Sequence, residues 1–158
     1  MPWGSSAWAN DAAWGPTGDP KVAASWFPLL KLQYAALKDL LANWDAVAPA
    51  GSTDGDAVRR KIGTVGVSSP LSAVKKTFSA IRDSEDVAEE IDLADFVEAY
   101  QAVLTDLSDA ENDLYSANFA DFSGGGQLKG TNFIKAAKKS IAAAKLNFEE
   151  ILRTLQLD

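Results

Sequence analysis

Two residue types that could carry chemistry, histidine and cysteine, do not occur in this chain of 158 residues. Without them there is no Ser-His-Asp or Cys-His nucleophile, no ordinary transition-metal site and no side chain whose unperturbed pKa lies near neutrality. Disulfide bonds are excluded as well. We therefore predict no catalytic residue, no metal ligand and no cofactor, and we look for residues that bind other proteins.

Carboxylates are the most numerous reactive groups, and they gather in one part of the chain. Every formal charge between Asp83 and Asp121 is acidic, whereas basic residues gather at positions 59–61 and 135–145. Neither "TDGDAV" nor "SDAENDL" has the spacing of a calcium loop, and a compact helical bundle offers little room for a catalytic carboxylate pair. We interpret the acidic run as a surface that exchanges weak ion pairs with the basic final segment. Ion binding or catalysis by this run stays open as an alternative.

The first candidate for binding a partner is a compact basic cluster made of Arg59, Arg60 and Lys61. The net charge of the chain is −7, so this cluster stands out from an acidic background. Guanidinium groups bind carboxylates through paired hydrogen bonds. We predict that the cluster docks carboxylates of a partner, and the alternative is that its side chains are simply solvated.

The second candidate is the tryptophan-rich start of the chain, which contains Trp3, Trp8 and Trp14 among Gly, Pro, Ser and Asn. This segment has neither a helical nor a strand period, so it cannot build a core of its own. Large aromatic side chains with one polar group are common anchors of protein interfaces. We predict that residues 1–20 form an extended docking strap whose tryptophans occupy grooves of a partner. The alternative is that the strap folds back and packs on its own helices beside Trp26.

Charge and hydropathy also indicate which partners to exclude. An acidic chain is a poor ligand for nucleic acids or anionic membranes, which are bound through Lys and Arg. The longest apolar-rich stretch, residues 22–48, contains four charged residues, which argues against a membrane span. The first residues have neither a basic nor an apolar region typical of a targeting segment. The chain is therefore expected to be either cytosolic or given in its mature form.

The spacing of apolar residues predicts the elements that position these candidates. Long amphipathic helices are expected over residues 27–48, from Pro70 to about residue 82, from residue 85 or 92 to 117, and from residue 131 to 155. The expected caps are Ser68 or Ser69 for the second helix and Thr131 for the last. A short helix carrying the basic cluster is expected to have Asp54 or Asp56 as its N-terminal cap and to be closed by Gly63. Aromatic residues after the third helix are expected to cap the core, or else to face a partner: Tyr115, Phe119 and Phe122.

Four such segments joined by short loops bury their apolar stripes most simply against one another. We predict an all-α fold, an antiparallel up-down-up-down four-helix bundle over residues 21–158 that follows the N-terminal strap. The alternative is a three-helix core in which the third segment is broken between Ser84 and Asp92.

Two stretches, "GDAVRRKIGTVGVSSPLSAVKKTFSAIRD" and "DLYSANFADFSGGG", resemble known proteins. They are similar to the lumenal four-helix extrinsic proteins of photosystem II in algae with red-lineage plastids, the PsbQ-like group. The resemblance covers roughly residues 27–158 and depends on the helix pattern and on the turn "GTVGVSSPL". The tryptophan-rich first twenty residues match nothing in that family.

The resemblance implies a non-enzymatic subunit of the plastid thylakoid lumen that sits on the lumenal face of a photosystem core. Such proteins help to retain calcium and chloride and shield the manganese cluster without ligating the metal. The implied partners are the photosystem core and other lumenal subunits, bound through protein contacts at the membrane periphery, with no small-molecule substrate. Two alternatives remain, a lumenal accessory subunit of photosystem I and a general helical-bundle adaptor protein.

Overall fold

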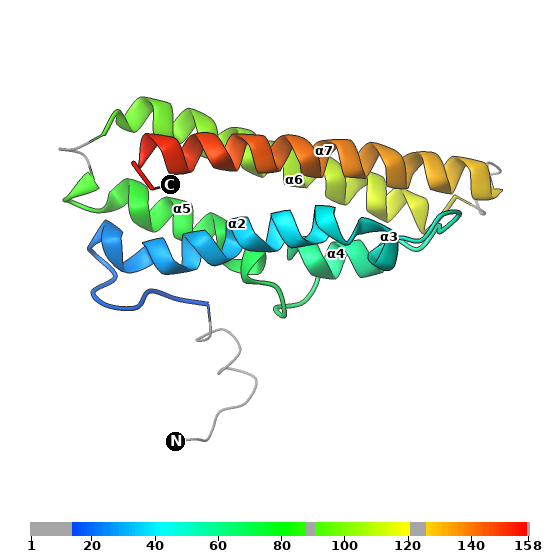
Figure 1. The fold of residues 1–158 in the computed structure, drawn as a ribbon, viewed down its shortest axis with the longest axis horizontal. Helices are drawn as coiled ribbons and strands as arrows, with labels where there is room; N and C mark the ends of the chain where they lie inside the picture. The colour runs from blue at the N-terminus through cyan, green and yellow to red at the C-terminus, as the bar shows by residue number, and fades with distance from the viewer. Residues whose placement is uncertain (1–13, 88–90, 121–125, 158) are drawn as a thin grey trace, which may run out of the picture.

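The fold is built from helices throughout the part of the chain that the computed structural model describes, residues 14–87, 91–120 and 126–157 (Figure 1). These residues form no β-strand, which confirms the predicted all-α class. They contain six α-helices and two short 3₁₀ helices: η1 (Ala23–Trp26), α2 (Phe27–Ala42), α3 (Trp44–Val47), α4 (Asp56–Ile62), η2 (Pro70–Ala73), α5 (Val74–Asp83), α6 (Leu93–Ala117) and α7 (Gly126–Thr154). None of the helices in these residues is both long enough and apolar enough to cross a bilayer.

The first predicted helix is divided into α2 and α3 at Asn43. This residue has φ −113° and ψ 26°, outside the helical region, and its side-chain amide donates to the Asp39 carbonyl at 2.9 Å. The interruption allows the indole of Trp44 to be buried in the core. Pro28 lies in the first turn of α2, where a missing N–H leaves no helical bond unmade.

The segment that carries the basic cluster folds largely as its sequence predicts. Helix α4 ends at Gly63, whose φ of +80° is the left-handed conformation that favours glycine after a helix. Ser69 then caps the next helical segment, because its Oγ accepts a hydrogen bond from the Leu71 amide at 3.2 Å. Pro70 occupies the first position, as expected, although the opening turn is the 3₁₀ helix η2.

Helices α6 and α7 form the most extensive helix pair in the structure. Helix α7 begins at the end of the molecule where α6 finishes, so the two run in opposite directions (Figure 1). Asp92 caps α6 through its side chain, which accepts from the Asp95 amide at 3.2 Å. The predicted stripes are buried along both helices: Phe96, Tyr100, Val103, Leu107, Ala110, Leu114 and Ala117 on α6, and Ile134, Ala137, Ile141, Ala144, Phe148, Ile151 and Leu155 at or just beyond α7.

The predicted start of the last helix is wrong, because α7 begins at Gly126 and contains Thr131 in its second turn. The Thr131 hydroxyl donates to the Leu128 carbonyl at 2.9 Å and caps nothing. Gly130 lies so close to a neighbouring loop that a Cβ there would be 2.7 Å from Thr53 Cγ2. Helix propensity alone does not predict this close tertiary approach of Gly130 to Thr53.

Aromatic rings connect helices α2, α5, α6 and α7 through the core. Phe78 on α5 stacks with Tyr100 on α6 at 5.3 Å between ring centroids, and it contacts Phe148 on α7 at 5.6 Å. Phe148 in turn lies 5.9 Å from Tyr34 on α2. These contacts fix the position of α2, whose C-terminal half forms one wall of the site described next.

Candidate protein-binding site

The three residues of the basic cluster have different surroundings, and Arg59 is engaged within its own protein. Its guanidinium binds both carboxylate oxygens of Glu111 at 2.9 Å and the Asp56 carboxylate at 3.0 Å. It also lies over the ring of Tyr115 at 5.4 Å from the centroid. The Glu111 hydrogen bond raises the pKa of Arg59, despite an opposing effect of burial. Arg59 therefore ties α4 to α6, and the structure places no free charge there for a partner.

A second set of contacts holds the beginning of α4 against the end of α6. The Asn118 side chain accepts from the Gly55 amide and donates to the Asp56 carboxylate, both at 2.8 Å. The hydrogen bond that Asp56 receives from Asn118, and then the one it receives from Arg59, lower the pKa of its carboxyl group. A Cβ at Gly55 would lie 2.2 Å from the Leu114 carbonyl oxygen, so only glycine permits this approach. The rotation of α4 about its axis is fixed as a result.

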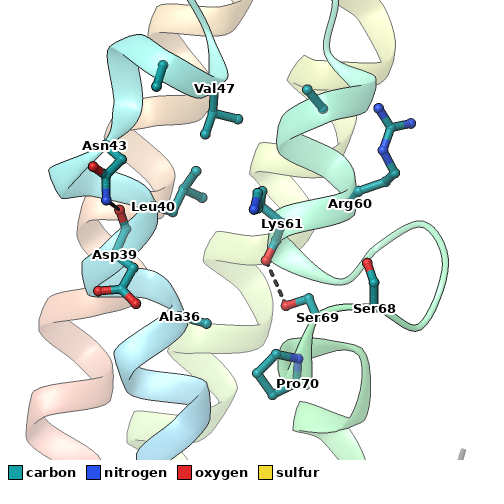
Figure 2. A pocket seen from close by; sticks show the side chains of 12 residues that line it. Ala36, Asp39, Leu40, Asn43, Val47, Arg60, Lys61, Ser68, Ser69 and Pro70 are labelled. Carbon is teal, nitrogen blue, oxygen red and sulfur yellow. Dashed lines mark hydrogen bonds between the residues drawn. The ribbon is translucent and has the colours of Figure 1, made fainter. Parts of the chain in front are cut away.

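This rotation leaves Arg60 and Lys61 exposed on another side of α4. Neither side chain has a hydrogen-bond or ion-pair partner among the described residues. Both line a pocket of about 690 Å³ that we call the α2–α4 groove (Figure 2). Its lining is completed by residues of α2, α3, α4 and the following loop: Ala36, Asp39, Leu40, Asn43, Ala46, Val47, Ala57, Ser68, Ser69 and Pro70.

The two walls of the α2–α4 groove differ in chemistry. Figure 2 shows Leu40 and Val47 pointing from α2 and α3 towards α4, while Lys61 lies on the α4 side. Among the described residues, Asp39 is the only carboxylate in the lining, and it stands on the α2 wall. The groove thus combines apolar surface with one cation, Lys61, on its α4 side and one anion, Asp39, on the other, and Figure 2 shows the Arg60 guanidinium at the outer rim, pointing away from α2.

The lower end of the groove is held in place by buried hydrogen bonds. The Ser69 hydroxyl donates to the Lys61 carbonyl at 2.8 Å and so joins the loop to the end of α4 (Figure 2). The buried Gln33 amide donates to the Pro70 carbonyl at 3.0 Å and to the Thr77 hydroxyl at 2.9 Å. These contacts make the groove a preformed feature of the fold.

Trp14 is the one member of the predicted tryptophan set within the described residues; Trp3 and Trp8 lie outside them. Its indole N–H donates to the Val67 carbonyl at 2.6 Å, and the partly buried ring packs against the hydrophobic core. The contact is with the protein's own loop, as in the alternative in which the strap folds back. Val67 directly precedes Ser68, which lines the α2–α4 groove. Trp14 therefore lies close to one end of this groove.

The acidic run shows no cation-binding arrangement in the part of the chain that the structure covers. No three carboxylates there form a group that could hold a metal ion. Burial raises the pKa of Asp106 and of Asp113, with a smaller contribution from the nearby charge of Asp109. The side-chain amide of Asn147 on α7 donates to Asp106 at 2.7 Å.

The expected exchange of ion pairs between the acidic third helix and the basic last helix takes another form. Lys145 pairs with Glu149 at 2.9 Å and Arg153 pairs with Glu150, so these basic residues of α7 are neutralised within their own helix. On the acidic helix, Glu111 pairs with Arg59 of α4. The charges therefore stabilise α7 locally and join α4 to α6.

The aromatic residues at the end of α6 do not cap the core as expected. Tyr115 is 52% exposed and Phe119 is 46% exposed, with their ring centroids 4.9 Å apart. They line a smaller pocket of about 310 Å³ with Lys129 and Phe133 of α7. Phe122 lies outside the described residues.

Sequence analysis missed the α2 wall of the groove, including Asp39 and Asn43. A signal was present: the apolar stripe that three-four spacing predicts over residues 27–48 passes through Leu37 and Trp44, and the apolar Leu40 and Val47 fall beside it. The groove they help to form offers cationic donors and apolar surface to a protein segment.

No protein-family model, curated protein or solved structure matches the chain.

Proposed function

We propose that this chain is a non-enzymatic extrinsic subunit that docks on the lumenal face of a photosystem, with photosystem II as the first candidate. The observation that carries the proposal is the α2–α4 groove, in which Arg60 and Lys61 remain unpaired among the described residues. The turn "GTVGVSSPL", on which the resemblance to PsbQ-like proteins depends, supplies one wall of this groove through Ser68 and Ser69. The resemblance and the groove therefore involve the same segment.

The proposed architecture is an antiparallel four-helix bundle in which short helices combine into long segments. Helices α2 and α3 would form the first segment, α4, η2 and α5 the second, and α6 and α7 the third and fourth. The aromatic contacts among α2, α5, α6 and α7 support this grouping. In this proposal the groove lies between the first two segments.

The proposed docking strap, residues 1–20, adds a second point of attachment. The Trp14 indole N–H donates a hydrogen bond to the Val67 carbonyl. Residues 14–20 also contact the rest of the chain through Trp26, whose indole N–H donates to the Pro20 carbonyl at 2.9 Å. Trp3 and Trp8 would occupy grooves of the partner complex. A membrane-associated but peripheral subunit of the plastid thylakoid lumen would then be attached through protein contacts alone.

The proposal is tested by recovering complexes from detergent-solubilised thylakoids of an alga with a red-lineage plastid. The tagged full chain is compared with a chain lacking residues 1–13 and with the Trp14→Ala variant. Photosystem II subunits, identified by mass spectrometry, are expected with the full chain and should decrease at least several-fold when residues 1–13 are removed. Circular dichroism checks that helix content is unchanged.

The outcomes of this experiment separate the candidate assemblies. Recovery of photosystem I subunits in place of photosystem II would transfer the proposal to the other photosystem. Recovery of neither photosystem would overturn it and leave the chain as a helical adaptor of another assembly.

A further inference from the structure

We propose that the α2–α4 groove binds an acidic segment of the partner polypeptide, with carboxylates at Lys61 and at Arg60 on the rim and an apolar side chain against the partly exposed Val47 and Ala57. This inference rests on the proposed docking function and specifies which chemistry the partner must present. The occupant is a segment of another protein chain, not a small molecule or a polyanion.

Charge is the first argument for an acidic occupant. The chain has a net charge of −7, yet the α4 side of the groove carries two adjacent cations. Arg59 is neutralised by Asp56 and Glu111, whereas Arg60 and Lys61 form no salt bridge within the described residues, and the charge of Arg60 only acts at longer range on Asp56. Cations grouped beside apolar surface are complementary to a segment that combines carboxylates with an apolar side chain.

Hydrogen-bonding groups on the walls favour a peptide as the carrier of those carboxylates. Ser68 and Asn43 both line the groove, and neither the Ser68 hydroxyl nor the Asn43 carboxamide oxygen has a partner among the described residues. One can donate and the other can accept, as the main chain of a bound segment requires. The apolar lining between them gives an anchoring side chain a place to be buried.

Asp39 sets the orientation and limits the ligand. Its carboxylate lies on the α2 wall, so a second carboxylate placed there would be repelled. A bound segment therefore directs its acidic side chains to α4 and presents N–H groups or a basic side chain to Asp39. Polyanions with uniformly spaced charge do not satisfy both walls.

The experiment places a photo-crosslinking amino acid, benzoylphenylalanine, at position 46 of the full-length chain, where the exposed Ala46 lines the groove. The protein is mixed with detergent-solubilised thylakoids, irradiated, and the cross-linked peptides are sequenced by mass spectrometry. The expected result is a cross-link to an identified partner segment that contains Asp or Glu within a few residues of the linked position. The double variant Arg60→Glu and Lys61→Glu should reduce its yield about tenfold or more.

A matched control makes the same change of charge elsewhere. Lys135 and Lys139 are exposed on α7, lie outside the groove and have no partner among the described residues. The double variant Lys135→Glu and Lys139→Glu should keep the cross-link yield. Circular dichroism and thermal unfolding of both double variants show that each remains folded.

A second measurement tests the charge of the ligand directly. The cross-linked segment is synthesised as a labelled peptide, together with a version in which Asp and Glu are replaced by Asn and Gln. Fluorescence anisotropy with the full chain should show at least about tenfold weaker binding of the amide version. Equal affinities of the two peptides would overturn the proposal.

Other outcomes also decide against an acidic partner segment. A cross-link to residues 1–13 of the same chain, to a second copy of the chain, or to a segment without carboxylates would each overturn it. The same holds if no cross-link forms at position 46, or if both double variants behave alike. Photosystem recovery that survives charge reversal without the cross-link would preserve the proposed function and reject the groove. A cross-link to an acidic segment of a different assembly would support the groove proposal and reject the proposed function.

Discussion

Arg59 and Arg60 are neighbours in the chain, but they serve different purposes in the structure. The side chain of Arg59 is only 18% exposed and forms ion pairs with Asp56 and Glu111, while that of Arg60 stands at the rim of the α2–α4 groove. A basic triplet on a helix points its members in different directions, because successive residues are about 100° apart. One arginine therefore holds the helix in place and leaves the next available for binding.

Substitution of the two arginines should separate these roles. Arg59→Ala is expected to lower the free energy of unfolding by about 1–2 kcal/mol, because it leaves Glu111 and Asp56 without their charge-assisted hydrogen bonds. Arg60→Ala should change it by less than about 0.5 kcal/mol. Urea denaturation of both variants measures the difference, and equal losses would show that the Arg59 network contributes no stability.

The sequence identified this basic cluster but could not assign its members. Composition and position indicate that Arg59, Arg60 and Lys61 are unusual in an acidic chain. Which of them is neutralised depends on Glu111, fifty-two residues further along the chain. Local spacing carries no information about such a distant partner, so the split between structural and free cations required the structure.

At the scale of elements, periodicity predicted the buried faces of α6 and α7 well and that of α2 less well. The stripe that three-four spacing predicts over residues 27–48 passes through Tyr34, which is half-buried, but not through the fully buried Gln33. A buried amide contradicts the rule that buried residues are apolar, and Gln33 is tolerated because Pro70 and Thr77 accept its hydrogen bonds. Its Oε1 has no hydrogen-bond partner among the described residues.

The connection from α4 to η2 depends on two glycines that offer a clean comparison. Gly63 and Gly66 both have positive φ, at +80° and +72°. A Cβ at Gly63 would lie 2.3 Å from the Ser72 amide nitrogen, whereas nothing lies within 4 Å of one at Gly66. Gly63 therefore serves both backbone conformation and close packing, and Gly66 serves conformation alone.

We expect Gly63→Ala to destabilise the protein by about 2–4 kcal/mol and Gly66→Ala by about 1 kcal/mol. Both variants pay for the left-handed backbone, but the first must also move η2 away from α4. Chemical denaturation gives the two values. If they agree, η2 shifts freely, and the groove wall built on Ser69 and Pro70 is softer than the structure indicates.

At the scale of the whole molecule, one hydrogen bond joins the first long helix to the last. The Tyr34 hydroxyl donates to the Glu149 carboxylate at 2.6 Å, across 115 residues of sequence. Burial, and then the bond to Glu149, raises the pKa of Tyr34 to about 12. The same bond, with a second one from Lys145, lowers the pKa of Glu149.

This link predicts a specific loss of stability in alkali. Because the folded-state pKa of Tyr34 is raised from 10.0 to about 12, its contribution is complete below pH 10 and is lost as the pH rises towards 12. Tyr34→Phe should cost about 1 kcal/mol at pH 8, and its difference from the wild type should shrink between pH 10 and 12. Urea denaturation across this range measures it, with Tyr115→Phe as the exposed control. A difference that stays constant with pH would contradict the assignment.

The helix order has a consequence for the way the chain is made. Helix α7, the last to be synthesised, packs against both α6 and α2, and its Phe148 completes the ring contacts with Phe78 and Tyr34. A ribosome adding roughly 5–20 residues per second needs on the order of ten seconds to proceed from Tyr34 to Glu149. During that time the apolar stripes of α2 and α5 lack their final cover and are open to chaperones. A core that closes only when α7 is in place therefore cannot be completed until nearly all of the residues from Tyr34 to Glu149 have been synthesised.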